Sequence, residues 1–112
     1  MAELRVGALP DGALAAATEF HSRVLPQLDP PPKGEDLVLV FQPADHSHRN
    51  WRLAVIQSLA REFAPMRVNG LVSDSEDAIV AALDYLATAA GVTGQLLELD
   101  DRGAGEVLSS RP

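Results

Sequence analysis

The sequence has 112 residues, a length that fits one domain with a single hydrophobic core. Its 16 acidic and 9 basic side chains give a net charge of −7, which excludes a strongly basic surface for nucleic acid or an anionic membrane. The chain contains no cysteine, so disulfides and thiolate chemistry are excluded as well. It has neither a signal-peptide pattern nor an apolar run of the ~18 residues that span a membrane, so we expect a cytoplasmic protein.

The first part of the chain predicts two strands and one helix. Residues 4–9 are mostly apolar and stop at a Pro-Asp-Gly turn, which is typical of a strand. Apolar residues recur at helical spacing over 11–28, and Pro26 is expected to kink or end this helix. Three consecutive prolines make 29–36 a loop. Residues 37–41 are all apolar, which indicates a strand buried on both faces.

The second part predicts two helices and two strands. The helix expected over 49–63 carries apolar residues around an unusually wide arc, so it should pack against two partners. A strand is expected over 66–72, and the acidic, serine-containing segment 73–77 begins a third helix that Gly91 ends. The last strand is expected over 95–99.

Strands and helices therefore alternate, which predicts an α/β fold. We expect a small parallel sheet of about four strands, joined by right-handed βαβ units, with helices on both faces. Residues 1–103 are interpreted as one domain and residues 104–112 as a flexible C-terminal tail.

One polar cluster, Asp45-His46-Ser47-His48-Arg49, follows the second predicted strand. Two imidazoles and a carboxylate are suitable ligands for a divalent metal, and ligands of α/β proteins bind at this end of the strands. The alternative is a solvated loop in which Asp45 or Ser47 caps the next helix. We favour the cap, because no third histidine or acidic segment completes a metal site.

The segment 58–72, SLAREFAPMRVNGLV, resembles the short-chain dehydrogenase/reductase family, whose members carry a helix ending in SLAxExAP and a strand beginning IRVN. Downstream, Val92-Thr93-Gly94-Gln95 is similar to the family's TGQ turn before its last strand. Upstream, residues 23–28 and 37–41 are similar to the family's LPxM helix end and the strand after it. The resemblance covers residues 14–103 and implies a half-Rossmann-like domain.

The departures from the family pattern concern its chemistry. The family's glycine-rich cofactor half would precede this chain, so the resemblance implies no bound cofactor and no cofactor-binding residues here. The positions of the family's catalytic tyrosine and lysine fall on Asp45 and Arg49, which cannot reproduce a phenol activated by an ammonium group. Segment 73–75 replaces the family's Pro-Gly and substrate loop. We therefore assign no catalytic and no metal-binding residue.

In the family, the helices that correspond to 11–28 and 49–63 pair with the same helices of a second subunit. The resemblance thus implies a non-catalytic interaction module, which forms a homo-oligomer or pairs with a full-length short-chain dehydrogenase. The wide apolar arc of 49–63 favours the same conclusion. The predicted interface residues are Val24, Leu25, Trp51, Val55 and Leu59.

Two alternatives stay open. The chain could be a cofactor-binding or accessory subunit of an NAD(P)-dependent oxidoreductase that completes a site on a partner or uses Asp45, His46, His48 and Arg49 for new chemistry. It could also be a decayed dehydrogenase without a selected role. For Trp51, Val55 and Leu59, the alternative to an interface role is that they are ordinary core side chains that face the sheet.

Overall fold

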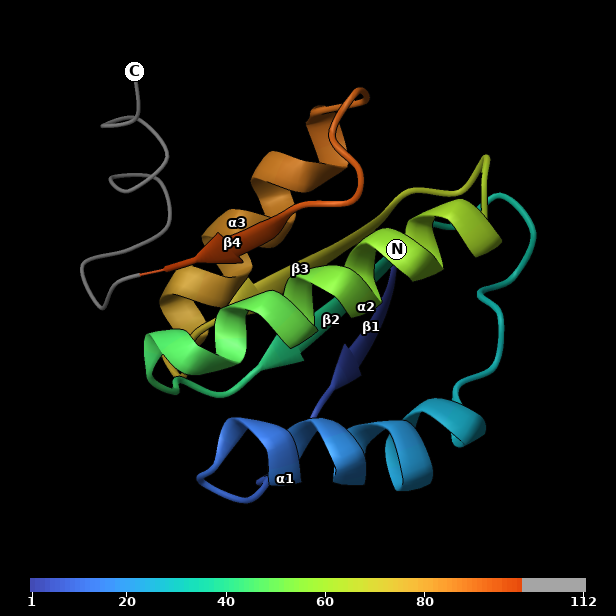
Figure 1. The fold of residues 1–112 in the computed structure, drawn as a ribbon. Coiled ribbons are helices and arrows are strands. Elements are labelled where there is room, and N and C mark those ends of the chain that lie inside the picture. The colour runs from blue at the N-terminus through green and yellow to red at the C-terminus, as the bar shows by residue number, and fades with distance from the viewer. Residues whose placement is uncertain (100–112) are drawn as a thin grey trace.

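The computed structural model describes residues 1–99 and shows a parallel four-stranded sheet with the strand order β1-β2-β3-β4 (Figure 1). The strands are β1 (Ala2–Arg5), β2 (Leu37–Phe41), β3 (Val68–Val72) and β4 (Leu96–Glu98). The α/β class with a parallel sheet is confirmed. The tail predicted over 104–112 lies outside the described residues.

Three connections carry the helices. The first contains α1 (Ala13–Glu19), which continues through the wide π-helical turn η1 (Phe20–Val24) and the 3₁₀ turn η2 (Leu25–Gln27). The second contains the 3₁₀ turn η3 (His46–His48) and α2 (Arg49–Glu62), and the third contains α3 (Glu76–Thr88). Ser75 caps α3, because its hydroxyl accepts a hydrogen bond from the Ala78 amide.

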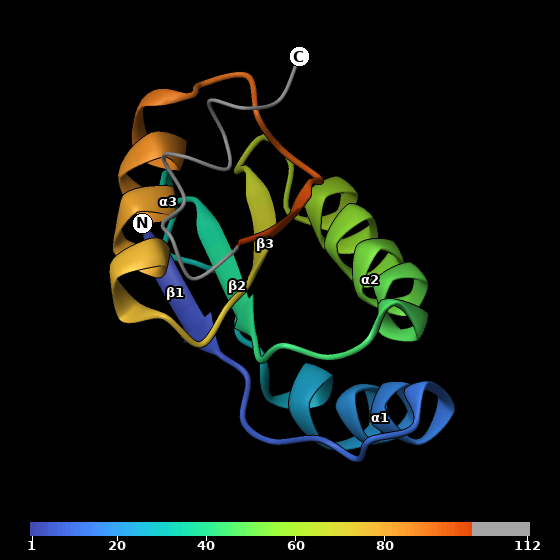
Figure 2. The same ribbon diagram turned by 90° about the vertical axis from the view of Figure 1, so that its left-hand side faces the viewer.

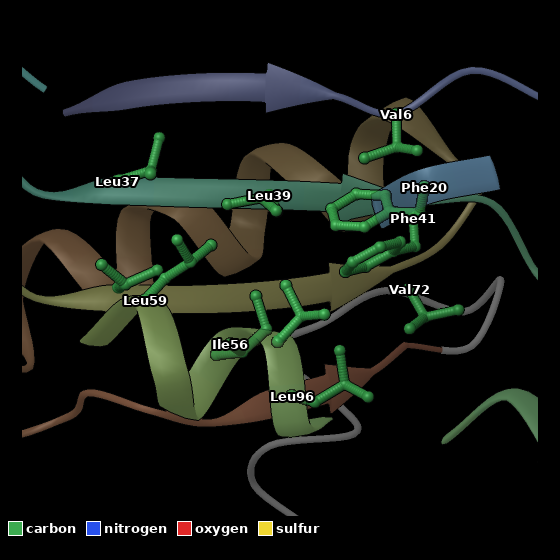
Figure 3. Close-up of a cluster of buried hydrophobic side chains, with 11 residues drawn as sticks. Val6, Phe20, Leu37, Leu39, Phe41, Ile56, Leu59, Val72 and Leu96 are labelled. Carbon is green, nitrogen blue, oxygen red and sulfur yellow. The ribbon is translucent and has the colours of Figure 1, made fainter. Parts of the chain in front are cut away.

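The helices cover both faces of the sheet, α1 and α2 on one and α3 on the other (Figure 2). On the α1–α2 side, the alternating residues Leu37, Leu39 and Phe41 of β2 pack with Ile56 of α2 and Phe20 of η1 (Figure 3). On the α3 side, Val38 and Val40 of the same strand pack with Ile79, Ala82 and Leu86. The uninterrupted apolar run of β2 is therefore explained by two separate cores.

The third crossover corrects the expectation of right-handed βαβ units throughout. Each connection moves one strand further in the same direction across the sheet, from β1 to β4. Because α3 covers the face opposite α1 and α2, its crossover must have the opposite hand to theirs. Seen from the α2 side, the strands run left to right from β1 at the top to β4 at the bottom (Figure 3), so the first two crossovers are right-handed and the third is left-handed.

The first strand and the first helix differ most from the sequence prediction. The first strand was expected over 4–9 but occupies Ala2–Arg5, because its ladder with β2 ends where the Val6 amide donates to the Val40 carbonyl and β2 itself ends one residue later. The helix expected over 11–28 is α-helical only to Glu19, widens over Phe20–Val24 and tightens into the 3₁₀ turn Leu25–Gln27, which contains Pro26. Both differences depend on strand pairing and on side-chain packing with distant residues, which the spacing of apolar residues in the sequence does not predict.

The MRVN segment has a structural role at the start of β3. The Arg67 guanidinium donates to the Asp36 carboxylate, at 2.9 Å from Nε and 2.7 Å from NH2, and to the Leu86 and Ala89 carbonyls at the end of α3. Asn69 is buried, donates to the Val92 carbonyl and accepts from the Gln95 amide. These two side chains therefore join the loop before β2, the end of α3 and the turn before β4.

Gly70 permits the close approach of α2 to the sheet. A Cβ at this position would lie 2.9 Å from Leu96 Cδ1 and 3.0 Å from two carbons of Ile56. No side chain larger than hydrogen fits there without moving these neighbours.

We expect Asp36→Asn to lower the free energy of unfolding by about 2 kcal/mol at neutral pH, as measured by urea denaturation. Burial opposes ionisation of Asp36, but the hydrogen bonds from Arg67 outweigh it and hold the pKa of Asp36 below its usual value. The contribution of the ionised carboxylate is therefore complete above its ordinary pKa of about 3.9 and is lost as the pH falls through the lower folded value.

The matched control is Glu35→Gln, which removes an exposed carboxylate that pairs with the N-terminal amine. This control should change the free energy of unfolding by less than about 0.5 kcal/mol. The stabilising role of ionised Asp36 would be contradicted if both variants lost the same free energy of unfolding. It would also be contradicted if Asp36→Asn stayed less stable than the unaltered chain in strong acid.

Candidate functional site

The candidate site is a hollow of about 350 Å³ at the carboxyl ends of β1 and β2. Its walls are the chain after β1 (Val6 to Asp11), the end of β2 with the chain that follows it (Phe41 to Asp45), and the side chains of His48 in η3 and Arg52 in α2. Parallel α/β sheets bind their ligands at this end of the strands. The cluster singled out in the sequence therefore lies beside the hollow, as expected.

Asp45 caps the 3₁₀ turn η3 that leads into α2. Its Oδ1 accepts a hydrogen bond from the Ser47 amide at 2.9 Å and another from the Ser47 hydroxyl. The hydroxyl and then the amide stabilise the anion and hold the pKa of Asp45 below its usual value. Asp45 is therefore an ionised residue that caps η3. The cap was expected on the helix itself, but the N-cap of α2 is His48, which makes no side-chain capping hydrogen bond.

His48 is buried and occupied by structural contacts. Its Nε2 lies 2.8 Å from the Asp11 carbonyl, and its Nδ1 accepts a hydrogen bond from the Trp51 indole at 3.3 Å. Nε2 must therefore carry the proton that is donated to the carbonyl. His46 is exposed on the same turn.

Within residues 1–99, no three or more histidine, aspartate or glutamate side chains gather in a group that could hold a metal ion. In the described part of the chain, Asp45, His46 and His48 therefore do not come together as a set of metal ligands, and both ring nitrogens of His48 are engaged by Asp11 and Trp51.

Arg49 lies at the start of α2 and forms an ion pair with Glu98 of β4, with 3.5 Å between the guanidinium and the carboxylate. Both side chains are exposed. Arg49 therefore fastens the start of α2 to the far edge strand and points away from the hollow, in whose lining it does not take part.

Arg52 is the residue at this site that the sequence interpretation missed. It is only 6% exposed, its guanidinium carbon lies 4.8 Å from the centre of the Phe41 ring and 5.7 Å from that of Trp51, and its Nε has no hydrogen-bond partner. Burial lowers the pKa of Arg52, and the negative charge of Glu98 opposes that shift only in part. The signal was present: Arg52 precedes Val55, Ile56 and Leu59 at helical spacing, inside the buried stripe of α2.

The five predicted interface residues lie in or beside the α1–α2 core. Val55 and Leu59 are 5% and 8% exposed and belong to the hydrophobic cluster against the sheet. Trp51 is half-buried among the rings of Phe20, Phe41 and two histidines. Val24 and Leu25 are half-buried against the same cluster. Their packing within the chain leaves only parts of Val24, Leu25 and Trp51 open to a partner.

The fold is that of a parallel α/β domain in which the three βαβ units occupy the whole described chain. Residues 4–99 match the family described as SDR-like, short chain dehydrogenase-like protein. The chain belongs to this family, and the resemblance found in its sequence is confirmed. Searches of curated proteins and of solved structures find no match. Among the described helices, none has the length and apolar character needed to cross a membrane.

We expect Arg52→Met to raise the free energy of unfolding by about 1 kcal/mol in a thermal or urea melt. Methionine keeps the apolar length of the side chain against Phe41 and Trp51 and removes a buried charge whose Nε is unsatisfied. Arg49→Met, three residues earlier on the same helix, removes only an exposed ion pair and should change stability by less than about 0.5 kcal/mol. A clear loss of stability in Arg52→Met would show instead that the cation–π contacts exceed the desolvation cost.

Proposed function

We propose that this chain is a non-catalytic interaction module of the short-chain dehydrogenase-like family. It associates with a second copy, or with a full-length short-chain dehydrogenase subunit, through the exposed sides of α1 and α2. We call these sides the α1–α2 surface; it includes Leu14 and Thr18 of α1 and Ala54 and Gln57 of α2. Family membership and the chemistry of Asp45 and Arg49 support a non-catalytic member of the family. The exposed Leu14 supports association through the α1–α2 surface.

The absence of catalysis is argued from Asp45 and Arg49, which occupy the positions of the family's tyrosine and lysine. A catalytic phenol donates a proton to a carbonyl, whereas Asp45 is an anion that accepts two hydrogen bonds from Ser47. Arg49 is paired with Glu98, and its planar guanidinium does not reproduce the compact ammonium group of a lysine. Both residues therefore hold the local structure and have no acid–base role.

The observation that carries the interaction is Leu14, which is 84% exposed on the outer side of α1. The middle of the outer side of the neighbouring α2 carries three exposed, uncharged residues, Ala54, Gln57 and Ser58, which would let another helix approach, and the charged Arg61 follows one turn later. Removing an exposed leucine side chain from water lowers the free energy of the complex, so a partner that covers Leu14 is bound more tightly. The half-buried Val24, Leu25 and Trp51 would border this contact.

Leu14→Glu is expected to lower the mass of the purified chain, measured by light scattering over a concentration series, below that of the unaltered chain. The charge would be placed in the centre of the contact, where it cannot be solvated. Val80→Glu is the matched control, because Val80 is 48% exposed on α3 at the other face. The proposal is wrong about this surface if both variants keep the mass of the unaltered chain, or if both reduce it equally.

The hollow beside Arg52 favours a second candidate function, that of a cofactor-binding or accessory subunit of an oxidoreductase. A buried guanidinium with an unsatisfied Nε in the wall of a hollow is suited to an anionic group, such as a cofactor phosphate. Asp11 and Asp45 also line this hollow and oppose the binding of an anion, which is why we place this candidate second.

Titration of the chain with NADH and NADPH, followed by nucleotide fluorescence, separates the two functions. The interaction module is expected to show no saturable binding. Saturable binding that Arg52→Met abolishes and Arg49→Met retains would establish the second candidate in its place.

A further inference from the structure

The edge of β1 is an open row of backbone hydrogen-bonding groups. Within residues 1–99, β1 pairs only with β2 and is the outermost strand of the sheet. The amides of Ala2 and Val6 donate to the Asp36 and Val40 carbonyls on the β2 side. Because successive residues of a strand direct their N–H and C=O groups to opposite sides, those of Glu3 and Arg5 point away from β2. This edge offers two donors and two acceptors.

We propose that a second copy of this chain pairs with this edge, antiparallel, with Leu4 opposite Leu4 of that copy. In this register Glu3 of each chain lies opposite Arg5 of the other, so that each outward N–H meets an outward C=O. Four strands from each chain then form one continuous eight-stranded sheet. The interface is separate from the α1–α2 surface and does not depend on it.

The charges select this register among those that the backbone allows. A residue whose backbone N–H and C=O point away from β2 must lie opposite another such residue of the second copy. The residue that lies opposite itself, at the centre of the pairing, can therefore be Glu3, Leu4 or Arg5. Centring on Glu3 or on Arg5 places two like charges directly opposite, which destabilises a strand pair. Centring on Leu4 places unlike charges opposite at both positions. The Glu3–Arg5 pair is therefore complementary to a copy of itself.

The apolar face supports the same register. Ala2 and Leu4 pack against the core on the α1–α2 side of the sheet but are only half-buried, while Glu3 and Arg5 lie on the other face, where Arg5 bonds Glu76 at 2.9 and 3.0 Å. A groove runs along this edge on the apolar side, between β1 and the segment 23–32. A two-fold axis perpendicular to the sheet places the apolar faces of both copies on the same side. Leu4 would then lie opposite Leu4 of the second copy, and Ala2 opposite its Val6.

Charged residues on an edge strand often prevent association, and this is the competing explanation. That function is best served by charges of one sign, which repel a second copy in every register. Glu3 and Arg5 have opposite signs and are spaced two residues apart on one face, the arrangement that attracts an antiparallel copy. The two explanations therefore predict opposite results when a charge is reversed.

The test uses full-length chains that carry Leu14→Glu, so that the α1–α2 surface contributes no association. In this background we expect a dimer by sedimentation or light scattering. Glu3→Arg places Arg opposite Arg, and Arg5→Glu places Glu opposite Glu, so each variant alone should dissociate about tenfold more readily. Mixing the two restores Glu–Arg pairs at both positions, and a one-to-one heterodimer should form. Circular dichroism checks that each variant is folded.

Within one chain, the Arg5 guanidinium also donates to the Glu3 carboxylate. Mixing separates the proposed interface from the loss of this internal contact, because neither variant regains it when mixed. A Leu14→Glu chain that is monomeric at all concentrations would overturn the edge pairing and leave the α1–α2 proposal untouched. Dimers that tolerate both charge reversals, or variants that do not combine on mixing, would also overturn it. An unaltered chain that dimerises only through Leu14 would support the α1–α2 surface alone.

Discussion

Both faces of β2 must be kept from water, and this requirement determines where the helices lie. Leu37, Leu39 and Phe41 enter one core while Val38 and Val40 enter the other, and all five are nearly fully buried. One layer of helices covers only one face, so α1 and α2 occupy one side and α3 the other. The left-handed third crossover follows from this requirement, because β4 extends the sheet in the same direction while its helix covers the opposite face.

The same arrangement explains what Asp45 and Arg49 do in this chain. The turn after β2 must reverse the chain into α2, and Asp45 stabilises it by capping η3. Arg49 and Arg67 each join segments that are distant in the sequence, α2 with β4 and the loop before β2 with the end of α3. The polar residues that the family motif contributes are thus engaged in holding a four-stranded domain together.

The fold was predictable from the sequence because it depends on patterns of apolar residues. The continuous run 37–41 and the spacing within 49–63 place β2 and α2 to within a residue of the observed elements. The limits of β1 and the widening of the first helix at Phe20 depend on partners distant in the sequence. At the site, the Asp45 cap was foreseen because capping is local, whereas the burial of Arg52 depends on Phe41, which belongs to another element.

The two proposed contacts constrain each other by symmetry. When the partner at the α1–α2 surface is a second copy, each contact joins identical surfaces and therefore has a two-fold axis. The axis of the β1 pair stands perpendicular to the sheet, whereas a contact between two α1–α2 surfaces stacks one molecule over the other and has its axis parallel to the sheet. Two perpendicular axes that intersect generate a closed set of four chains, and axes that fail to intersect generate an open filament. A soluble assembly that uses both surfaces must therefore be a tetramer, with the β1 edges paired inside it and no strand edge of that kind left to recruit further chains.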